Sequence, residues 1–320
     1  MELLFLTPLG AVFALAAILP LGVLALRERR ARRVRAALGL RESSWRLLLP
    51  VAIALAAVAG LLALAATQPI IETERTVRER TDAEAFLLVD VSRSMLAAAD
   101  AGAPTRLERA RVVAEGLRRR LPQVPIGLMS LTDRVLPHLF PTTDGTVFVA
   151  TIERAMGIER PPPALFFSTR ATSLNALESI PQRSFYSKTA RKRLLVVLTD
   201  GESQDVTADL RRAYSRRPPI ETFVVHVWDD GEAIYETGVP ERGYEPDRSS
   251  ARVVASVAEQ LGGRVFTEAE ADELGAAAEA YFGDGATRER VIEGDRRALM
   301  PFVTFAALLP LGFVLLRRNL

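Results

Sequence analysis

The chain has 320 residues, of which 49% are hydrophobic and 25% are charged, and it contains no cysteine. The absence of cysteine excludes disulfides, thiolate metal sites and thiol catalysis. The formal net charge is +2, but arginines beside apolar segments dominate this value. Residues 47–316 alone hold 31 basic and 36 acidic residues, about −5. Nucleic acid is therefore not an expected partner of this part of the chain.

Three uncharged segments are long enough to cross a membrane as helices, namely residues 3–26, 47–66 and 299–316. About 20 residues of helix span the hydrocarbon core of a bilayer. Prolines within these segments are compatible with membrane helices, where neighbouring groups satisfy the freed backbone. We therefore predict a multi-pass membrane protein with three transmembrane helices.

The distribution of arginine predicts the orientation of these helices. The loop at residues 27–46 holds eight arginines and two glutamates, and Arg317 and Arg318 follow the third segment. Because basic residues favour the cytoplasmic side, we expect this loop and the tail at 317–320 to be cytoplasmic. The region between the second and third segments is then extracytoplasmic. The first segment is interpreted as an anchor and not a signal peptide, because Met1-Glu2 offers no basic start.

Apolar runs of strand length alternate with helical patterns in the long middle region. This alternation predicts an α/β domain with a doubly wound, mostly parallel sheet over residues 85–284, flanked by connectors at 67–84 and 285–298. The first connector is charged, as expected of a solvated connector or an edge strand. The helix at 106–121 has an apolar stripe, and we interpret its arginines as solvated surface. The expected strands are 86–89, 126–131, 194–198, 222–227 and 264–267, and the expected helices are 106–121, 146–156, 173–180, 206–215, 249–261 and 269–282.

Two long loops stand out within this domain. Residues 158–172 contain three consecutive prolines, and residues 228–248 are rich in Asp and Glu. Long loops in compact domains are often functional. The acidic segment 229–247 could hold a second cation, but we interpret it as a solvated insertion.

Oxygen-bearing side chains follow two of the predicted strands. The motif Asp90-Val-Ser92-Arg-Ser94 ends the first strand, and Asp200 ends the strand at 194–198. Thr172 precedes a predicted helix and can reach the same edge of the sheet. Carboxylate and hydroxyl oxygens are ligands for hard divalent cations, and open α/β sheets bind ligands at this edge. Asp90, Ser92, Ser94, Thr172 and Asp200 are therefore the candidate metal ligands.

This set of residues resembles the metal-ion-dependent adhesion site of the von Willebrand factor A (VWA) family, which combines Asp-x-Ser-x-Ser with a distant Thr and a distant Asp. The flanking apolar segments resemble membrane-bound proteins of the bacterial aerotolerance (Bat-type) group. The resemblance implies a divalent cation, Mg²⁺ first with Mn²⁺ and Ca²⁺ as alternatives, which binds a carboxylate of a protein partner. It also implies a scaffold or assembly role beside other VWA membrane proteins and a MoxR-type AAA+ ATPase.

The chain departs from the family pattern at two places. Arg93 stands where relatives usually have Gly, and it could attract an anionic partner or point to solvent; we favour solvent. Arg170 and Ala171 replace the glycines that usually precede the threonine, which makes Ser173 the alternative ligand to Thr172.

Two other functions are alternatives to metal-dependent binding: an enzyme and a metal-free structural domain. A Mg²⁺-dependent hydrolase or phosphotransferase would need a second nearby carboxylate or a general base. The sequence has no Asp-x-Asp, and His138 and His226 fall in strand-like runs, so we expect no enzyme. In a metal-free domain, Asp90 and Asp200 would only cap loops and helices. Two uncompensated carboxylates would repel each other, which favours the metal site.

Overall fold

The computed structural model describes residues 2–39, 49–160, 162, 172–204 and 206–318. Predictions for 40–48, 163–171 and 319–320 lie outside these residues, including Arg41, Arg46, Arg170 and Ala171. The chain forms two compact units, Met1–Thr76 with Val291–Leu320 and Val77–Arg290, which are described separately.

The first unit contains three helical segments that are long and apolar enough to cross a membrane among the described residues: Pro8–Ala37, Leu49–Ala66 and Met300–Arg317. This result confirms the three predicted apolar helices. The expected helix at 3–26 is wrong at its start, because residues 2–5 form a strand, and it continues past residue 26 through arginines, which are good helix formers. The elements are β1 (Glu2–Phe5), the 3-10 helix η1 (Pro8–Ala17), α1 (Ile18–Ala37), α2 (Leu49–Ala66) and α9 (Met300–Arg318).

Two long strands, β2 (Pro69–Arg80) and β11 (Thr287–Ala298), link the two units covalently. They lie beside each other in a three-stranded sheet of order β1-β2-β11, and β1 pairs antiparallel with β2. In the second unit, Glu79 of β2 is buried and lies 3.4 Å from Arg288 of β11. The charged connector sequences thus form paired strands and not loops.

The second unit is built on a six-stranded sheet of order β10-β8-β7-β3-β5-β6. All neighbouring pairs are parallel except β5 and β6, which are antiparallel. The five predicted strands are confirmed, and β6 is an additional edge strand. The strands are β3 (Ala83–Asp90), β5 (Ile126–Leu131), β6 (Val135–Thr142), β7 (Lys192–Thr199), β8 (Ile220–His226) and β10 (Arg264–Thr267).

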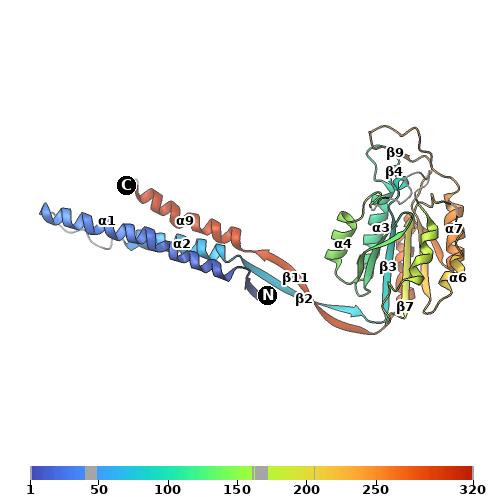
Figure 1. Cartoon of the computed structure of the whole chain (residues 1–320), viewed down its shortest axis with the longest axis horizontal. Helices are drawn as coiled ribbons and strands as arrows, with labels where there is room; N and C mark the ends of the chain where they lie inside the picture. The colour runs from blue at the N-terminus through green and yellow to red at the C-terminus, as the bar shows by residue number, and fades with distance from the viewer. Residues whose placement is uncertain (1, 40–48, 161, 163–171, 205, 319–320) are drawn as a thin grey trace. The chain divides into compact units, whose positions relative to one another are not determined.

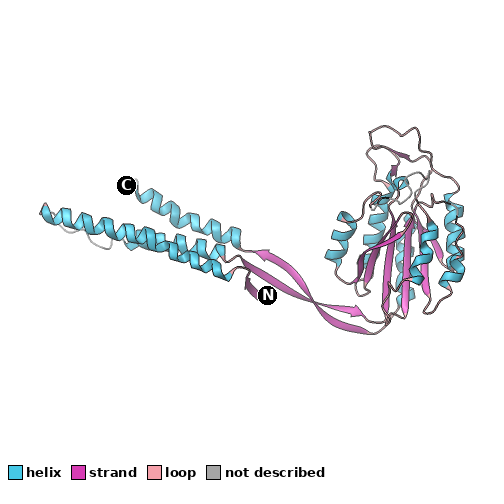
Figure 2. Cartoon of the chain, in the orientation of Figure 1, coloured by secondary structure: helices cyan, strands magenta, loops and turns pink. Residues whose placement is uncertain are grey.

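Helices cover both faces of this sheet, so the predicted doubly wound architecture is confirmed (Figures 1 and 2). One apolar cluster packs under α3 (Arg106–Arg120), α4 (Gly145–Arg154) and α8 (Ala271–Phe282). The other packs under α5 (Ser179–Gln182), α6 (Leu210–Tyr214) and α7 (Ser250–Leu261). The helix expected at 206–215 is shorter in the structure, where α6 covers only Leu210–Tyr214. The 3-10 helices are η3 (Arg93–Leu96), η4 (Leu174–Glu178) and η5 (Glu268–Glu270).

Arg80 joins the beginning and the end of the second unit. Its buried guanidinium donates hydrogen bonds to the carbonyl oxygens of Gly283 at 2.6 Å and Phe282 at 3.3 Å. Its side chain also donates to Asp82 at 2.8 Å, one residue before β3 begins. The start of β3 and the end of α8 are thus held together.

The direction of winding changes at β3. From β3 the chain moves to β5 on one side, and it later returns to β7 on the other side before continuing to β8 and β10. Such a switch point opens a crevice beyond the carboxyl ends of the two central strands, where α/β folds bind ligands. Asp90 is the last residue of β3, and Asp200 directly follows β7.

Candidate metal centre

Asp90 is fully buried, and two hydrogen bonds fix its carboxylate. Oδ1 accepts from the backbone N–H of Ser92 at 2.9 Å, and Oδ2 accepts from the Thr199 hydroxyl at 2.7 Å. Burial and the nearby carboxylate of Asp200 raise the pKa of Asp90 from its ordinary 3.8 to about 7. Burial disfavours the charged form of Asp90, and the negative charge of Asp200 adds to this effect.

The two serines of the motif stand at the beginning of η3. Ser92 precedes this 3-10 helix and is buried, while Ser94 lies within its first turn and is half-buried. Their hydroxyl oxygens are 3.0 Å apart. The tight turn after β3 therefore brings both hydroxyls of the motif together.

Thr172 lies between the loops that follow β5 and β7. Its carbonyl oxygen accepts from the backbone N–H of Gln204 at 2.9 Å, and the next residue, Ser173, donates from its N–H to the carbonyl of Thr132 at 2.8 Å. The Thr172 hydroxyl is buried and has no hydrogen-bond partner within the described part of the chain. The hydroxyl of Ser173, the alternative candidate ligand, accepts a hydrogen bond from the Asn175 side chain at 3.3 Å. Buried hydroxyls normally have partners, so the Thr172 oxygen is a candidate ligand atom.

Asp200 is held by groups that the sequence prediction did not include. Its Oδ1 accepts from the backbone N–H of Glu202 at 2.9 Å, and its Oδ2 lies 3.0 Å from Nη1 of Arg106. Asp200 is therefore paired with a cation, so repulsion between two uncompensated carboxylates does not by itself require a metal.

Arg106 is the largest correction to the sequence prediction, because its side chain is fully buried and not solvated. Besides Asp200, its guanidinium pairs with Glu202 at 2.8 Å and with Glu232 at 2.6 Å, and it donates to the Tyr244 hydroxyl at 2.9 Å. The signal was present in the sequence: Arg106 precedes Ala110 by four residues and thus lies on the apolar stripe of α3. Arg118 of the same helix is also buried and donates to backbone carbonyls.

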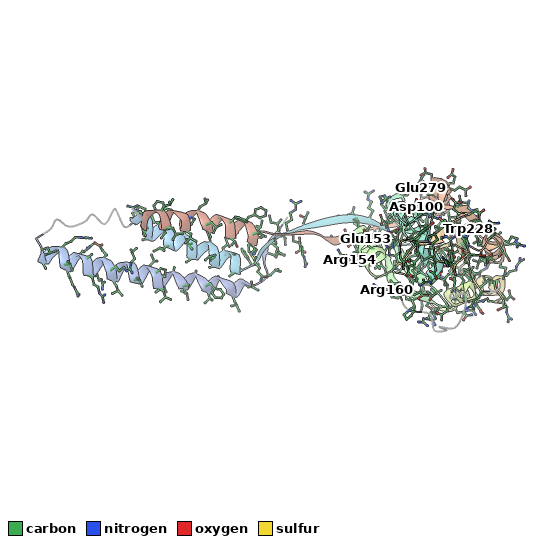
Figure 3. The ribbon with its side chains drawn as sticks, turned by 90° about the horizontal axis from the view of Figure 1, so that it is seen from above. Asp100, Glu153, Arg154, Arg160, Trp228 and Glu279 are labelled. Atoms are coloured by element: carbon green, nitrogen blue, oxygen red, sulfur yellow. The ribbon has the colours of Figure 1, made fainter. Side chains whose placement is uncertain are left out.

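The acidic segment after β8 packs on the same edge and is not merely a solvated insertion. Trp228, which is labelled in Figure 3, directly precedes this segment and stacks on His226. Its short strand β9 (Ala233–Ile234) pairs antiparallel with β4 (Ala97–Ala98), just after η3. Glu232 from this segment is buried against Arg106.

Arg93 does not simply point to solvent, as the sequence interpretation favoured. Its guanidinium donates to Glu236 at 2.9 Å and to Glu241 at 2.8 Å, both in the acidic segment. These two ion pairs hold the acidic segment beside the serine motif. A signal for this pairing was the excess of acid in the segment, although sequence spacing alone could not select the partner.

The donor set fits a hard divalent cation. Three buried carboxylates, Asp200, Glu202 and Glu232, pair with Arg106, and Arg109 pairs with Glu232. The buried carboxylate of Asp90 is near that of Asp200 and has no arginine partner among the described ion pairs. This leaves an excess of negative charge that a dication would offset. No group of three or more His, Cys, Asp or Glu side chains in the described ranges could hold a metal without other donors. A cation at this edge would therefore need hydroxyl oxygens as well as carboxylates as ligands.

The two histidines lie in strands, as predicted. His138 of β6 is within 2.7 Å of the Ser130 hydroxyl, and His226 of β8 is 3.1 Å from the carbonyl oxygen of Asp200. Burial lowers the pKa of both imidazoles. His226 is also 3.1 Å from the Ser250 hydroxyl, so the described partners of the two imidazoles are hydroxyls and a backbone carbonyl.

Comparison with known proteins places this architecture. No family model matches the chain, and no curated protein matches it. An aerotolerance-related membrane protein from Bacteroides fragilis matches with TM-score 0.50 and 21% identity, over 62% of this chain and 98% of that one. BatB from Bacteroides thetaiotaomicron matches with TM-score 0.49 and 16% identity, over 63% and 100%. A von Willebrand factor type A protein from Catenulispora acidiphila matches with TM-score 0.39 and 13% identity, over 65% and 49%.

The domain shares the fold of the Bacteroides fragilis protein, a doubly wound α/β sheet with helices on both faces. β3 and β7 are the central strands of the domain sheet. Asp90, Ser92, Ser94 and Asp200 lie at or just beyond their carboxyl ends, and the Thr172 carbonyl is hydrogen-bonded to Gln204 in the loop after β7. The structure adds Arg106, Glu202 and Glu232 to this edge.

Proposed function

We propose that this protein is a membrane-anchored VWA domain that binds protein partners through a divalent cation held by Asp90, Ser92, Ser94, Thr172 and Asp200. The observation that carries this proposal is the buried Thr172 hydroxyl without a partner in the described chain, at the sheet edge that also holds the two aspartates. A group that accepts lone pairs from that oxygen would satisfy it, and a cation does so.

The chemistry of the donors favours binding over catalysis. Neutral hydroxyls add no charge to the two carboxylates, so a bound dication keeps electrophilicity and can accept a carboxylate from a partner. We propose Mg²⁺ as the ion, with Mn²⁺ and Ca²⁺ as alternatives, because all three prefer oxygen ligands. The residues of this chain fix the donor oxygens, and Arg106 fixes Asp200.

The membrane arrangement belongs to the same proposal. The arginine-rich loop and the C-terminal tail would lie in the cytoplasm and the VWA domain outside it. On the resemblance to the Bat-type group, we propose other VWA membrane proteins and a MoxR-type ATPase system as partners in a scaffold or assembly role.

Removal of the unpartnered hydroxyl tests the metal site. We expect Thr172→Val to weaken Mg²⁺ binding to the full chain in detergent micelles by about tenfold or more, measured by isothermal titration calorimetry. The thermal stability without metal should change little, because the hydroxyl makes no hydrogen bond that the substitution would break. Asp90→Asn should abolish binding.

A matched control is available in β8. The Thr222 hydroxyl is also buried without a hydrogen-bond partner among described residues, but Thr222 pairs with Leu195, well before the end of β7 that leads to Asp200. Thr222→Val should therefore leave Mg²⁺ affinity unchanged. Equal affinities in both Val variants, or no binding by the wild type at millimolar Mg²⁺, would contradict the proposal. A captured partner should also dissociate on addition of chelator.

A further inference from the structure

A polar cavity lies at the opposite edge of the domain sheet from the candidate metal centre, where β7 and β8 begin. It has a volume of about 170 Å³, well above the roughly 10–15 Å³ that one water needs. Arg193, the second residue of β7, and Ile220, the first residue of β8, line it. The ends of α5 and α6 complete its wall. This cavity is separate from the metal-site residues, none of which lines it.

The side chains that line this cavity carry one sign of charge. Five of them are basic, and the described lining residues include no Asp or Glu. Elsewhere in the domain, arginines such as Arg109 and Arg120 pair with carboxylates. Within the described chain, no carboxylate forms an ion pair with any of the five basic lining residues: Arg183, Lys188, Arg193, Arg216 and Arg217.

One of these cations is held in place by the fold. Arg193 donates from Nε to the carbonyl of Ala190 at 3.0 Å and from Nη2 to the carbonyl of Ser187 at 2.9 Å. Its guanidinium lies 5.5 Å from the centre of the Tyr186 ring. Tyr186 is itself buried and donates its hydroxyl to the Leu194 carbonyl at 2.8 Å. Arg193 is thus a fixed positive group at the sheet end, while Arg183, Lys188, Arg216 and Arg217 are exposed around it.

We propose that this cavity binds a phosphate-type oxyanion. Guanidinium groups match the oxygens of phosphate in a bidentate way, and several of them around one space provide the charge that a doubly negative group needs. The exposed cations repel one another until an anion enters, and this makes binding favourable. A free phosphate and the headgroup of an anionic lipid present the same chemistry, and either could fill the site. This site does not depend on the proposed metal.

The test uses the full chain in nanodiscs of phosphatidylcholine, with inorganic phosphate as the titrant and calorimetry as the measurement. We expect Arg183→Gln with Arg216→Gln to weaken phosphate binding by at least tenfold. The control is Arg211→Gln with Arg212→Gln, which removes two exposed arginines of neighbouring α6 that do not line the cavity. The control should change the affinity by less than threefold.

Two results would overturn the proposal. One is the absence of phosphate binding by the wild type at low ionic strength, and the other is an equal loss of affinity in the two double variants, which would indicate a general charge effect. A parallel titration in nanodiscs that contain phosphatidylglycerol distinguishes the sources. Weaker phosphate binding there, only in chains with Arg183 and Arg216, identifies the lipid headgroup as the occupant; unchanged binding identifies free phosphate. Neither outcome depends on Mg²⁺, so failure here leaves the metal proposal intact.

Discussion

At the scale of single residues, the candidate site combines oxygen-bearing side chains at strand ends with a buried cation, Arg106, from α3. Asp90 and Asp200 follow apolar strands, and strand ends can be recognised from composition. Arg106 could have been recognised from its phase on the α3 stripe, because helical periodicity places it beside Ala110. Its three carboxylate partners come from segments distant in sequence, and no local pattern specifies such contacts.

The raised pKa of Asp90 predicts that this residue destabilises the metal-free protein. The pKa of Asp90 is 3.8 in the unfolded chain and about 7 in the fold. The contribution of this shift to the free energy of unfolding is therefore fully present below pH 3.8 and is lost as the pH rises through about 7. At pH 8 without metal, we expect Asp90→Asn to increase the free energy of unfolding by about 2–4 kcal/mol. Thermal unfolding of the full chain in micelles measures this difference.

Addition of Mg²⁺ should reverse the ranking. A ligand that binds only the folded state stabilises it, so millimolar Mg²⁺ should raise the unfolding temperature of the wild type and not of Asp90→Asn. Glu153→Gln on the exposed surface of α4 is the control, and it should behave like the wild type throughout (Figure 3). A destabilised Asp90→Asn at pH 8 without metal would contradict this account.

At the scale of elements, the five parallel strands of the domain sheet were predicted, and its antiparallel edge strand β6 was not among the predicted strands. The apolar runs of β5 and β10 were predicted with their observed bounds. The run around His138 looks strand-like, but β6 is absent from the predicted core strands because it contains Pro137 and Pro141, which are typical of edge strands and bulges. The charged sequences of β2 and β11 gave no apolar signal, since they pair mainly with each other and β1.

The acidic segment is held by two kinds of ion pair of different strength, which predicts its response to substitution. Glu232 is buried against Arg106, while Arg93 and its partners Glu236 and Glu241 are 40–51% exposed. Breaking a buried pair costs far more than breaking an exposed one. Glu232→Gln should therefore speed amide hydrogen exchange across residues 229–241 by about tenfold or more.

Arg93→Gln is the matched comparison for that experiment. Because exposed pairs contribute about 0–1 kcal/mol, exchange in the same segment should rise by no more than about fivefold. Glu245→Gln, an exposed residue of the segment, should have no effect. Exchange that is faster in Arg93→Gln than in Glu232→Gln would show that the exposed ion pairs of Arg93, and not Arg106, hold the segment.

At the scale of the whole molecule, the proposed sidedness can be measured directly because the chain has no cysteine of its own. A single cysteine at Glu245 should react with a membrane-impermeant maleimide in intact cells. A cysteine at Arg33, in the arginine-rich part of α1, should react only after the membrane is permeabilised. The reverse pattern would place the α/β domain in the cytoplasm.

The course of β3 has a mechanical consequence. The strand begins three residues after Arg80, which holds this start against the end of α8, and it ends at Asp90. Along its length it is hydrogen-bonded to β5 on one side and β7 on the other. A pull from a partner at Asp90 would run lengthwise through this central strand toward β2. Such a force would load the hydrogen bonds to β5 and β7 together, in shear, so these bonds could not break one after another.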